Sequence, residues 1–289
     1  MKLTQTIICF AILFLTSTQV YGQDEYNLDE TYQIDREGTI YLSSNDAEVS
    51  IEGSNRSDVR LVIYRYVDVD GINIGSSGSF RMDVEQRGGD LYIQENNSEN
   101  RTMFIGSVDE EYRITLEVPR NLALDLKGDD DSYEISNTNG AISINADDSD
   151  IELSEVTGED FDFDLDDGNI SIDEARGKLK LSMDDGELNV GRAEFTEIDA
   201  SLDDGELDIT TSLADGGLYL FDFDDGDLEL NITGGGGEFD IHHDDRNISV
   251  DNNFEEVSSD DERSVYRIAG GDARIEINTD DGNIELRTM

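Results

Sequence analysis

Residues 161–172 read Phe-Asp-Phe-Asp-Leu-Asp-Asp-Gly-Asn-Ile-Ser-Ile, and this pattern returns through much of the chain. Apolar residues alternate with polar ones on both sides of the Asp-Asp pair, which predicts two short strands with one buried side each. If the first Asp of the pair is numbered zero, the apolar residues before the pair lie at odd-numbered positions and those after it lie at even-numbered positions. Because a straight strand would keep one parity, the Asp-Asp-Gly must turn the chain or insert a bulge.

Copies of this pattern begin at Asp residues 129, 147, 166, 184, 203, 224, 244 and 280, and Gly follows the Asp pair in five of them. The first seven are 18 to 21 residues apart, and 36 residues precede the last. Repetition at such a period is typical of stacked repeat architectures. The sequence therefore predicts an all-β, single-domain parallel β-solenoid, β-helix-like, with coils of about 18–21 residues and Asp-Asp-Gly turns.

The repeats also suggest how the chain is divided. Looser matches to the pattern are centred at residues 45 and 87. We call these centres and the first Asp of each later copy anchors, and the anchors 45, 87 and 129 are 42 residues apart. This spacing predicts irregular N-terminal coils up to about residue 120. Regular repeats would occupy 121–250, and a C-terminal coil 266–289. We expect the polar segment 24–38 to cap one end and the insertion 251–268 to flank the other, because an uncovered sheet edge invites pairing.

The N-terminus carries an export signature. Lys2 precedes an apolar run that ends before small and polar residues, so residues 1–22 are interpreted as a signal peptide and 23–289 as the mature chain. Cys9, the only cysteine, lies in that run, and lipidation there is the less favoured alternative. No second apolar span follows. We expect an exported protein of the periplasm, the cell surface or the medium, without disulfides or a transmembrane span in the mature chain.

The composition narrows the choice of partners. The chain has 70 acidic and 20 basic residues, a formal net charge of −50. Such a surface repels the phosphates of nucleic acids and anionic membranes, so neither is expected as a partner. It suits cations, basic partners or high-salt surroundings. High charge can also indicate disorder, but the strict apolar alternation favours an ordered domain.

Two segments resemble a known family. Residues 118–126 read Val-Pro-x-x-Leu-x-Leu-x-Leu, and 269–286 carry Ala-Gly-Gly followed by alternating Ile, Thr, Gly, Ile and Leu. Over about 30–287 the chain resembles the exported "putative adhesin" β-solenoid domains of bacterial envelopes, a family of unknown function. The resemblance implies a surface or envelope binding module without a defined ligand. Those domains more often have Ser or Thr before the turn Gly, so the Asp-Asp pairs are a departure.

The Asp-Asp turns are candidate cation sites. Stacking places equivalent residues about 4.8 Å apart, and carboxylate oxygens at that density suit Ca²⁺. The alternative is that these Asp residues only stabilise turns through their own backbone. The glycine-rich nonapeptide of calcium-binding β-rolls is absent. The candidate ligands are Asp147, Asp148, Asp166, Asp167, Asp184, Asp185, Asp203, Asp204, Asp224, Asp225, Asp244 and Asp245.

His242 and His243, the only histidines, are candidate transition-metal ligands because neutral imidazole is a common ligand for such ions. Adjacent strand residues point to opposite faces, so we expect His243 to face inward and His242 outward instead. A polysaccharide-cleaving enzyme is a further alternative, since paired carboxylates could act as acid and base. Carboxylates are too abundant here to single out a pair, and no catalytic residue or cofactor is assigned.

The outward positions of successive coils would form long flat polar faces, which suit extended partners. The sequence therefore favours a non-catalytic exported envelope or surface protein, an adhesin-type binding or structural module for a glycan or protein ligand. A Ca²⁺-binding structural protein is the first alternative, and a polysaccharide-processing enzyme the second.

Overall fold

The computed structural model describes residues 22–74, 80–97, 103–244 and 247–289. Every regular element in these residues is a β-strand, so the all-β prediction is confirmed. Apart from Gly22, the predicted signal peptide lies outside the described residues. No helix in the described ranges has the length and apolar character needed to cross a bilayer.

The strands fall into three groups along the chain. The first holds β1 (Gly22–Gln33), β2 (Thr39–Ser43), β3 (Glu48–Ser54), β4 (Asp58–Ile74), β5 (Phe80–Arg87), β6 (Asp90–Asn97) and β7 (Met103–Pro119). The second holds β8 (Ala123–Lys127), β9 (Ser132–Ser136), β10 (Ile142–Asp148), β11 (Asp150–Thr157), β12 (Phe161–Ser212) and β13 (Leu218–Gly234). The third holds β14 (Gly237–His243), β15 (Ile248–Val250), β16 (Glu255–Ser259), β17 (Arg263–Ile268), β18 (Ala273–Thr279) and β19 (Asn283–Thr288).

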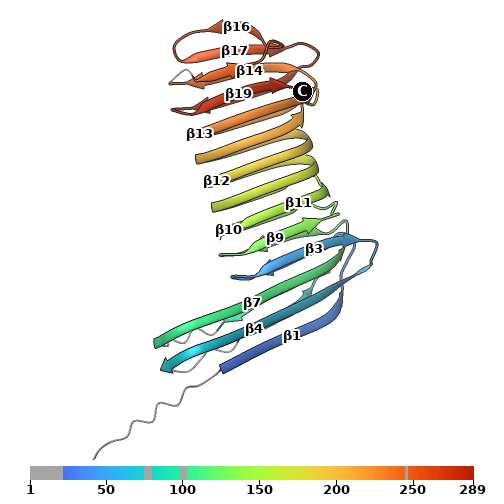
Figure 1. Cartoon of the computed structure of the whole chain (residues 1–289). Helices are drawn as coiled ribbons and strands as arrows, with labels where there is room; N and C mark the ends of the chain where they lie inside the picture. Colours follow the sequence, from blue (N-terminus) through green and yellow to red (C-terminus); the bar gives the residue numbers. More distant parts are fainter. Residues whose placement is uncertain (1–21, 75–79, 98–102, 245–246) are drawn as a thin grey trace, which may run out of the picture.

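The central strands form a regular ladder (Figure 1). Segments before the Asp-Asp turns stack in parallel on one side, which we call the leading face; there Ile142 of β10 lies between Leu124 of β8 and Phe161 of β12. Segments after the turns stack on the opposite side, the trailing face, where Ile151 of β11 lies between Tyr133 and Ile170. The two faces enclose one hydrophobic core made of the alternating apolar residues.

The prediction of a purely parallel β-solenoid is wrong. The described strands join in one sheet of mixed orientation that curls around the core like a nearly closed barrel. At the N-terminal end β1, β4 and β7 pair antiparallel, and so do β5 and β6. At the C-terminal end β17 pairs antiparallel with β14 and with β16. The expectation failed because alternation with period two is the same in parallel and antiparallel strands.

The order of the strands also departs from the order of the sequence. β18 lies between β13 and β14 on the leading face, and β19 lies between β13 and β15 on the trailing face. At the other end β2 lies between β6 and β8, and β3 between β7 and β9. A coil from each end of the chain is thus inserted between two others, so the anchors 45, 87 and 129 are not stacked in sequence order.

The glycine-rich run at 234–237 is explained by this insertion. The chain passes from β17 to β18 across the start of β14, and a Cβ on Gly236 would lie 2.7 Å from the carbonyl oxygens of Ile268 and Ala269. A Cβ on Gly271 would collide with the backbone of Gly236. The two backbones can therefore cross only because both residues lack side chains.

Candidate functional site

The Asp-Asp pairs are placed by the glycines that follow them. Gly168, Gly186, Gly205 and Gly226 have φ of 139°, 144°, 153° and 156°, a backbone region that side chains disfavour. They also stack on one another, so that a Cβ on Gly226 would lie 2.5 Å from the carbonyl oxygen of Gly205. The preceding Asp pairs are therefore held at one edge of the sheet.

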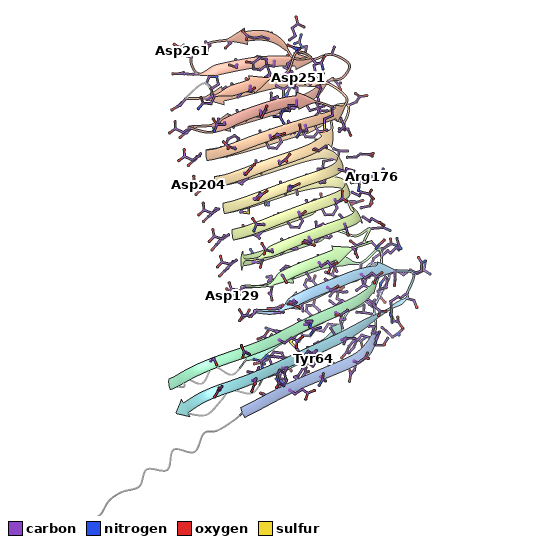
Figure 2. The ribbon with its side chains drawn as sticks, viewed as in Figure 1. Tyr64, Asp129, Arg176, Asp204, Asp251 and Asp261 are labelled. Carbon is purple, nitrogen blue, oxygen red and sulfur yellow. The ribbon has the colours of Figure 1, made fainter. Side chains whose placement is uncertain are left out.

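We call this edge the acidic rim, comprising Asp129–Asp130 and the equivalent pairs up to Asp280–Asp281. Figure 2 shows Asp129 and Asp204 along the rim, with Arg176 on the opposite side of the molecule, which we call the return edge. The second Asp residues align from coil to coil, as Asp204 does with Asp225. Eleven of the twelve candidate ligands are exposed at the rim, namely Asp147, Asp148, Asp166, Asp167, Asp184, Asp185, Asp203, Asp204, Asp224, Asp225 and Asp244. Asp245 lies outside the described residues.

In the described part of the chain, none of the ten rim carboxylates between Asp147 and Asp225 forms an ion pair. Desolvation, followed by repulsion from Asp185, Asp225 and their neighbours, raises the pKa of Asp204. No group of three or more metal-ligating side chains within the described ranges is arranged to hold one ion. The rim is thus a linear array of carboxylates rather than a closed metal centre.

Two arginines of β12 lie at the return edge. Arg192 makes two hydrogen bonds to Asp173, of 3.0 and 2.9 Å, and Arg176 pairs with Glu194 at 2.9 Å, both at the return edge. These pairs connect neighbouring coils. They also border an open groove that Thr157, Thr210, Ser212 and Thr233 help to line. Acidic residues at the return edge are therefore paired with arginine, whereas the described rim carboxylates from Asp147 to Asp225 form no ion pair.

The two histidines lie as the sequence predicted. His243 is buried and His242 is exposed. The His243 Nε2 atom lies 3.1 Å from the Ser264 hydroxyl, which in turn lies 3.1 Å from the hydroxyl of Ser259. Ser264 is fully buried, so a substrate cannot reach its hydroxyl. We interpret this contact as a hydrogen bond within the core rather than as a catalytic pair.

A buried carboxylate at the N-terminal junction escaped the sequence analysis. Asp131 is 2% exposed and occupies the position of the turn glycine in its copy. It accepts hydrogen bonds from the Ala47 amide at 2.6 Å, the Tyr133 hydroxyl at 3.2 Å and the Ser44 hydroxyl at 3.3 Å. Burial raises the pKa of Asp131 despite these bonds. The sequence signal that could have identified this residue is a third consecutive Asp at the position where other copies have glycine.

Three shallow depressions in the described part of the chain lie on the trailing face. One is lined by Asp150, Glu152, Asn169, Ser171, Glu187 and Asn189. A second lies toward the N-terminal end around Glu48 and Glu134, and a third toward the C-terminal end around Glu229 and Glu285. Carboxylates and hydroxyls line all three, and Asn side chains line the first and the third. The face can therefore both donate and accept hydrogen bonds at regular intervals.

A comparison with protein families identifies this architecture. The family model described as Toastrack DUF4097 matches residues 38–287, which is most of the chain. The chain belongs to the Toastrack DUF4097 family. This confirms the resemblance to domains of unknown function with adhesin-like relatives. No curated protein is significantly similar to the chain.

Several solved structures resemble this Toastrack chain at low identity. A protein from Bacteroides fragilis named "putative adhesin" is 12% identical, with 91% of this chain and 97% of that one covered and a TM-score of 0.46. Another of that name from Parabacteroides merdae is 13% identical, with 90% and 95% covered and a TM-score of 0.41. A protein from Parabacteroides distasonis named "putative lipid binding protein" is 14% identical, with 91% and 96% covered and a TM-score of 0.26.

Proposed function

We propose that this Toastrack protein is an exported, non-catalytic binding or structural module of the envelope or cell surface, whose trailing face receives an extended polar ligand such as a glycan or a protein segment. The row of depressions on that face carries the proposal. Its hydrogen-bonding groups recur with each coil, about every 4.8 Å. A regular, elongated surface of this kind suits an extended ligand better than a small substrate.

Binding to arrays of glycans and surface proteins tests this proposal. We expect saturable binding to a polymeric ligand that weakens when Glu152, Ser171 and Asn189 are together replaced by alanine. The control variant has the same number of alanine substitutions on the leading face, at Asp164, Ser182 and Ser201. We expect the control to bind as wild type does. Equal binding by wild type and both variants would contradict the assignment of the trailing face.

Export is a separate part of the proposal. The apolar N-terminal run supports removal of residues 1–22. Expression of the full chain in a bacterial host, followed by fractionation and mass measurement of the product, tests it. We expect a product that begins near Gln23 in the periplasm, at the surface or in the medium. A cytoplasmic product that retains Met1 would contradict export.

A second candidate function is association with Ca²⁺ along the acidic rim. It is supported by the aligned carboxylates of adjacent coils and by the lack of ion pairs at the described rim carboxylates from Asp147 to Asp225. Because cations that bind only the folded state raise the melting temperature, Tm should be measured with Ca²⁺, Mg²⁺ or EDTA at matched ionic strength. A rise with Ca²⁺ that Mg²⁺ does not match is expected if the rim binds calcium. Equal melting curves in all three conditions would indicate that the Asp pairs only stabilise the turns.

A further inference from the structure

β1 leaves one long edge of the sheet open. In the described part of the chain it pairs only with β4, in an unbroken antiparallel register from Gly22↔Val69 to Gln33↔Asp58. The backbone N–H and C=O groups of residues 24–32 that point away from β4 therefore pair with no other strand in the described part of the chain. Only the carbonyl of Gln33, at the end of the strand, accepts a hydrogen bond from the side chain of Gln86 in β5.

Three other strands at edges of the sheet are less suitable for pairing. β16 has five residues and a register shift between Glu256 and Ser258, and β15 has three residues. β5 has eight residues. Short and bulged strands protect sheet edges from added partners. The twelve residues of β1 have neither protection, so β1 is the longest continuous edge among these four strands.

An apolar row follows this edge on its inner side. Tyr26, Leu28 and Tyr32 lie on one side of β1, which they share with Glu30, and they pack against the core, yet each stays half-buried. The Tyr26 ring meets Phe80 edge to face at 5.1 Å, and Phe80 meets Tyr112 at 5.2 Å. An added strand could place apolar side chains beside this row. Such a strand would cover surface that β1 leaves in contact with water.

Charge restricts the identity of that strand. Asp24, Glu25, Asp29 and Glu30 are all exposed on β1. Arg60 of β4 pairs with Asp29, at 2.9 and 3.0 Å. Pairing β1 with β1 of a second copy would bring these carboxylates together, and like charges on neighbouring strands are destabilising. A strand with basic side chains would instead meet opposite charges.

We propose that the open edge of β1 is a docking site for an extended peptide segment of another protein, with alternating apolar and basic residues, which adds to the sheet as its next strand. Backbone hydrogen bonds supply affinity in this mode of recognition, and alternate side chains supply selectivity. Apolar residues cover the row at Tyr26, Leu28 and Tyr32, while Lys or Arg residues on the other side meet Glu25 and Asp29. The site is separate from the trailing face, so either proposal can fail without the other.

A synthetic peptide with the length of β1 and alternating Val and Lys tests this site. Binding is followed by fluorescence anisotropy, and the bound region by hydrogen exchange of the purified protein. We expect the Val-Lys peptide to bind and to protect the amides of β1 that do not pair with β4. A Val-Glu peptide should bind at least roughly tenfold more weakly.

Backbone-methylated peptides separate strand addition from charge attraction without altering the protein. Two series of peptides are made, one methylated at the odd-numbered backbone amides and the other at the even-numbered ones. Because only one edge of an added strand faces β1, we expect one series to lose binding and the other to retain it. Equal binding of both series, protection away from β1, or no binding of the unmodified peptide would overturn the proposal.

A pair of protein variants gives the second control. Leu28→Lys places a positive charge in the apolar row and should weaken Val-Lys binding by roughly tenfold. Val257→Lys places the same charge on β16, at a residue that is 49% exposed, and should leave binding unchanged. Equal loss in both variants would overturn the site. So would concentration-dependent dimers with β1 protected, because a second copy would then be the occupant.

Discussion

The turn glycines show how one missing side chain allows the coils to stack. At Gly186 the backbone adopts φ of 144°, and its Cα hydrogen faces the carbonyl oxygen of Gly168 in the neighbouring coil. Any side chain there would meet both the steric cost of that backbone region and a collision with the neighbouring coil. The same contact recurs between Gly205 and Gly186. The glycines therefore form a ladder in which a substitution at one affects the next.

Gly186→Ala should lower the free energy of unfolding by about 2 kcal/mol or more, since such strain costs of order 1–3 kcal/mol before the collision is counted. Gly191→Ala is the matched control. Its Cβ would lie 3.5 Å from the nearest atom, a side-chain oxygen of Asp173, which is an ordinary contact. Denaturant titration of both variants measures the difference. Equal stability of the two variants would contradict the role of the ladder.

Asp131 is a second residue whose environment sets a measurable property. Burial raises its pKa, so the folded state disfavours its charged form. A carboxyl whose folded pKa lies above its unfolded pKa destabilises the fold when charged, and stability rises as the pH falls through the folded value. Asp131→Asn should therefore raise Tm at neutral and alkaline pH. The carbonyl oxygen of Asn can still accept the hydrogen bond from Ala47.

The Tm advantage of Asp131→Asn over wild type should shrink as the pH falls into the acid range, where Asp131 itself becomes neutral. Asp130→Asn removes the same charge from an exposed neighbour and should give a smaller change. Melting curves over a pH series distinguish the two. A Tm below that of wild type at pH 8 would show that the hydrogen bonds of the carboxylate outweigh its burial.

The inserted coils are the main feature at the scale of the strands. β18 and β19 occupy a place between β13 and the next coil in sequence, and the chain returns there by way of the β16–β17 hairpin. Removing that coil would expose the edges of strands on both of its sides. Each end of the central ladder is thus closed by strands that arrive out of sequence order. We expect this arrangement to make the C-terminal coil necessary for stability.

Engineered disulfides test the strand order directly. Leu220 of β13 lies beside Glu276 of β18, which lies beside Asp240 of β14 on its other side. Neighbouring strands are about 4.8 Å apart, so the Leu220→Cys/Glu276→Cys pair should oxidise readily. Leu220→Cys/Asp240→Cys spans two strand spacings and should stay reduced, because Cα atoms more than about 7 Å apart cannot be bridged. Thiol titration and peptide mapping measure both, and the reverse result would favour stacking in sequence order.

This strand order explains how far the sequence could predict the fold. The parity change across Asp166–Asp167 correctly assigned which side chains face the core, because that depends only on local alternation. The copies at 224, 244 and 280 follow one template, so the pattern fits the order 224–244–280 as well as the observed 224–280–244. The antiparallel pairing of β4 with β7 could not be predicted for a similar reason. Apolar and polar residues alternate in the same way in parallel and antiparallel strands.

The candidate rim could be predicted in part for the same local reason. The twelve Asp residues were found because they recur at fixed offsets, and the structure places the eleven described ones at one edge. Asp131 was missed, because whether a carboxylate is buried depends on the coil that is inserted next to it. That neighbour is Ala47, 84 residues earlier in the chain. The open edge of β1 was equally hidden, since an edge is a property of the whole sheet.

At the scale of the whole molecule, charge is distributed unevenly over a surface with a formal net charge of −50. The faces and the return edge carry ion pairs such as Lys180–Asp162 and Arg192–Asp173. The rim concentrates carboxylates in adjacent coils, and their mutual repulsion helps to raise the pKa of Asp204. Because these groups are exposed, dissolved salt screens their repulsion. The fold should therefore become more stable with added NaCl.

The triple variant Asp185→Asn, Asp204→Asn and Asp225→Asn should raise Tm by a few degrees at low salt, because it removes carboxylates from three adjacent coils. A second triple variant, Glu134→Gln, Glu187→Gln and Glu255→Gln, removes the same net charge from separated positions and should raise Tm less. The difference between the two should vanish near 1 M NaCl, where the screening length is about 3 Å. It should also shrink as the pH falls, because the raised pKa of Asp204 means that its charge is lost early. Equal Tm values for the two variants at low salt would show that the total charge, and not the alignment of the carboxylates along the rim, limits stability.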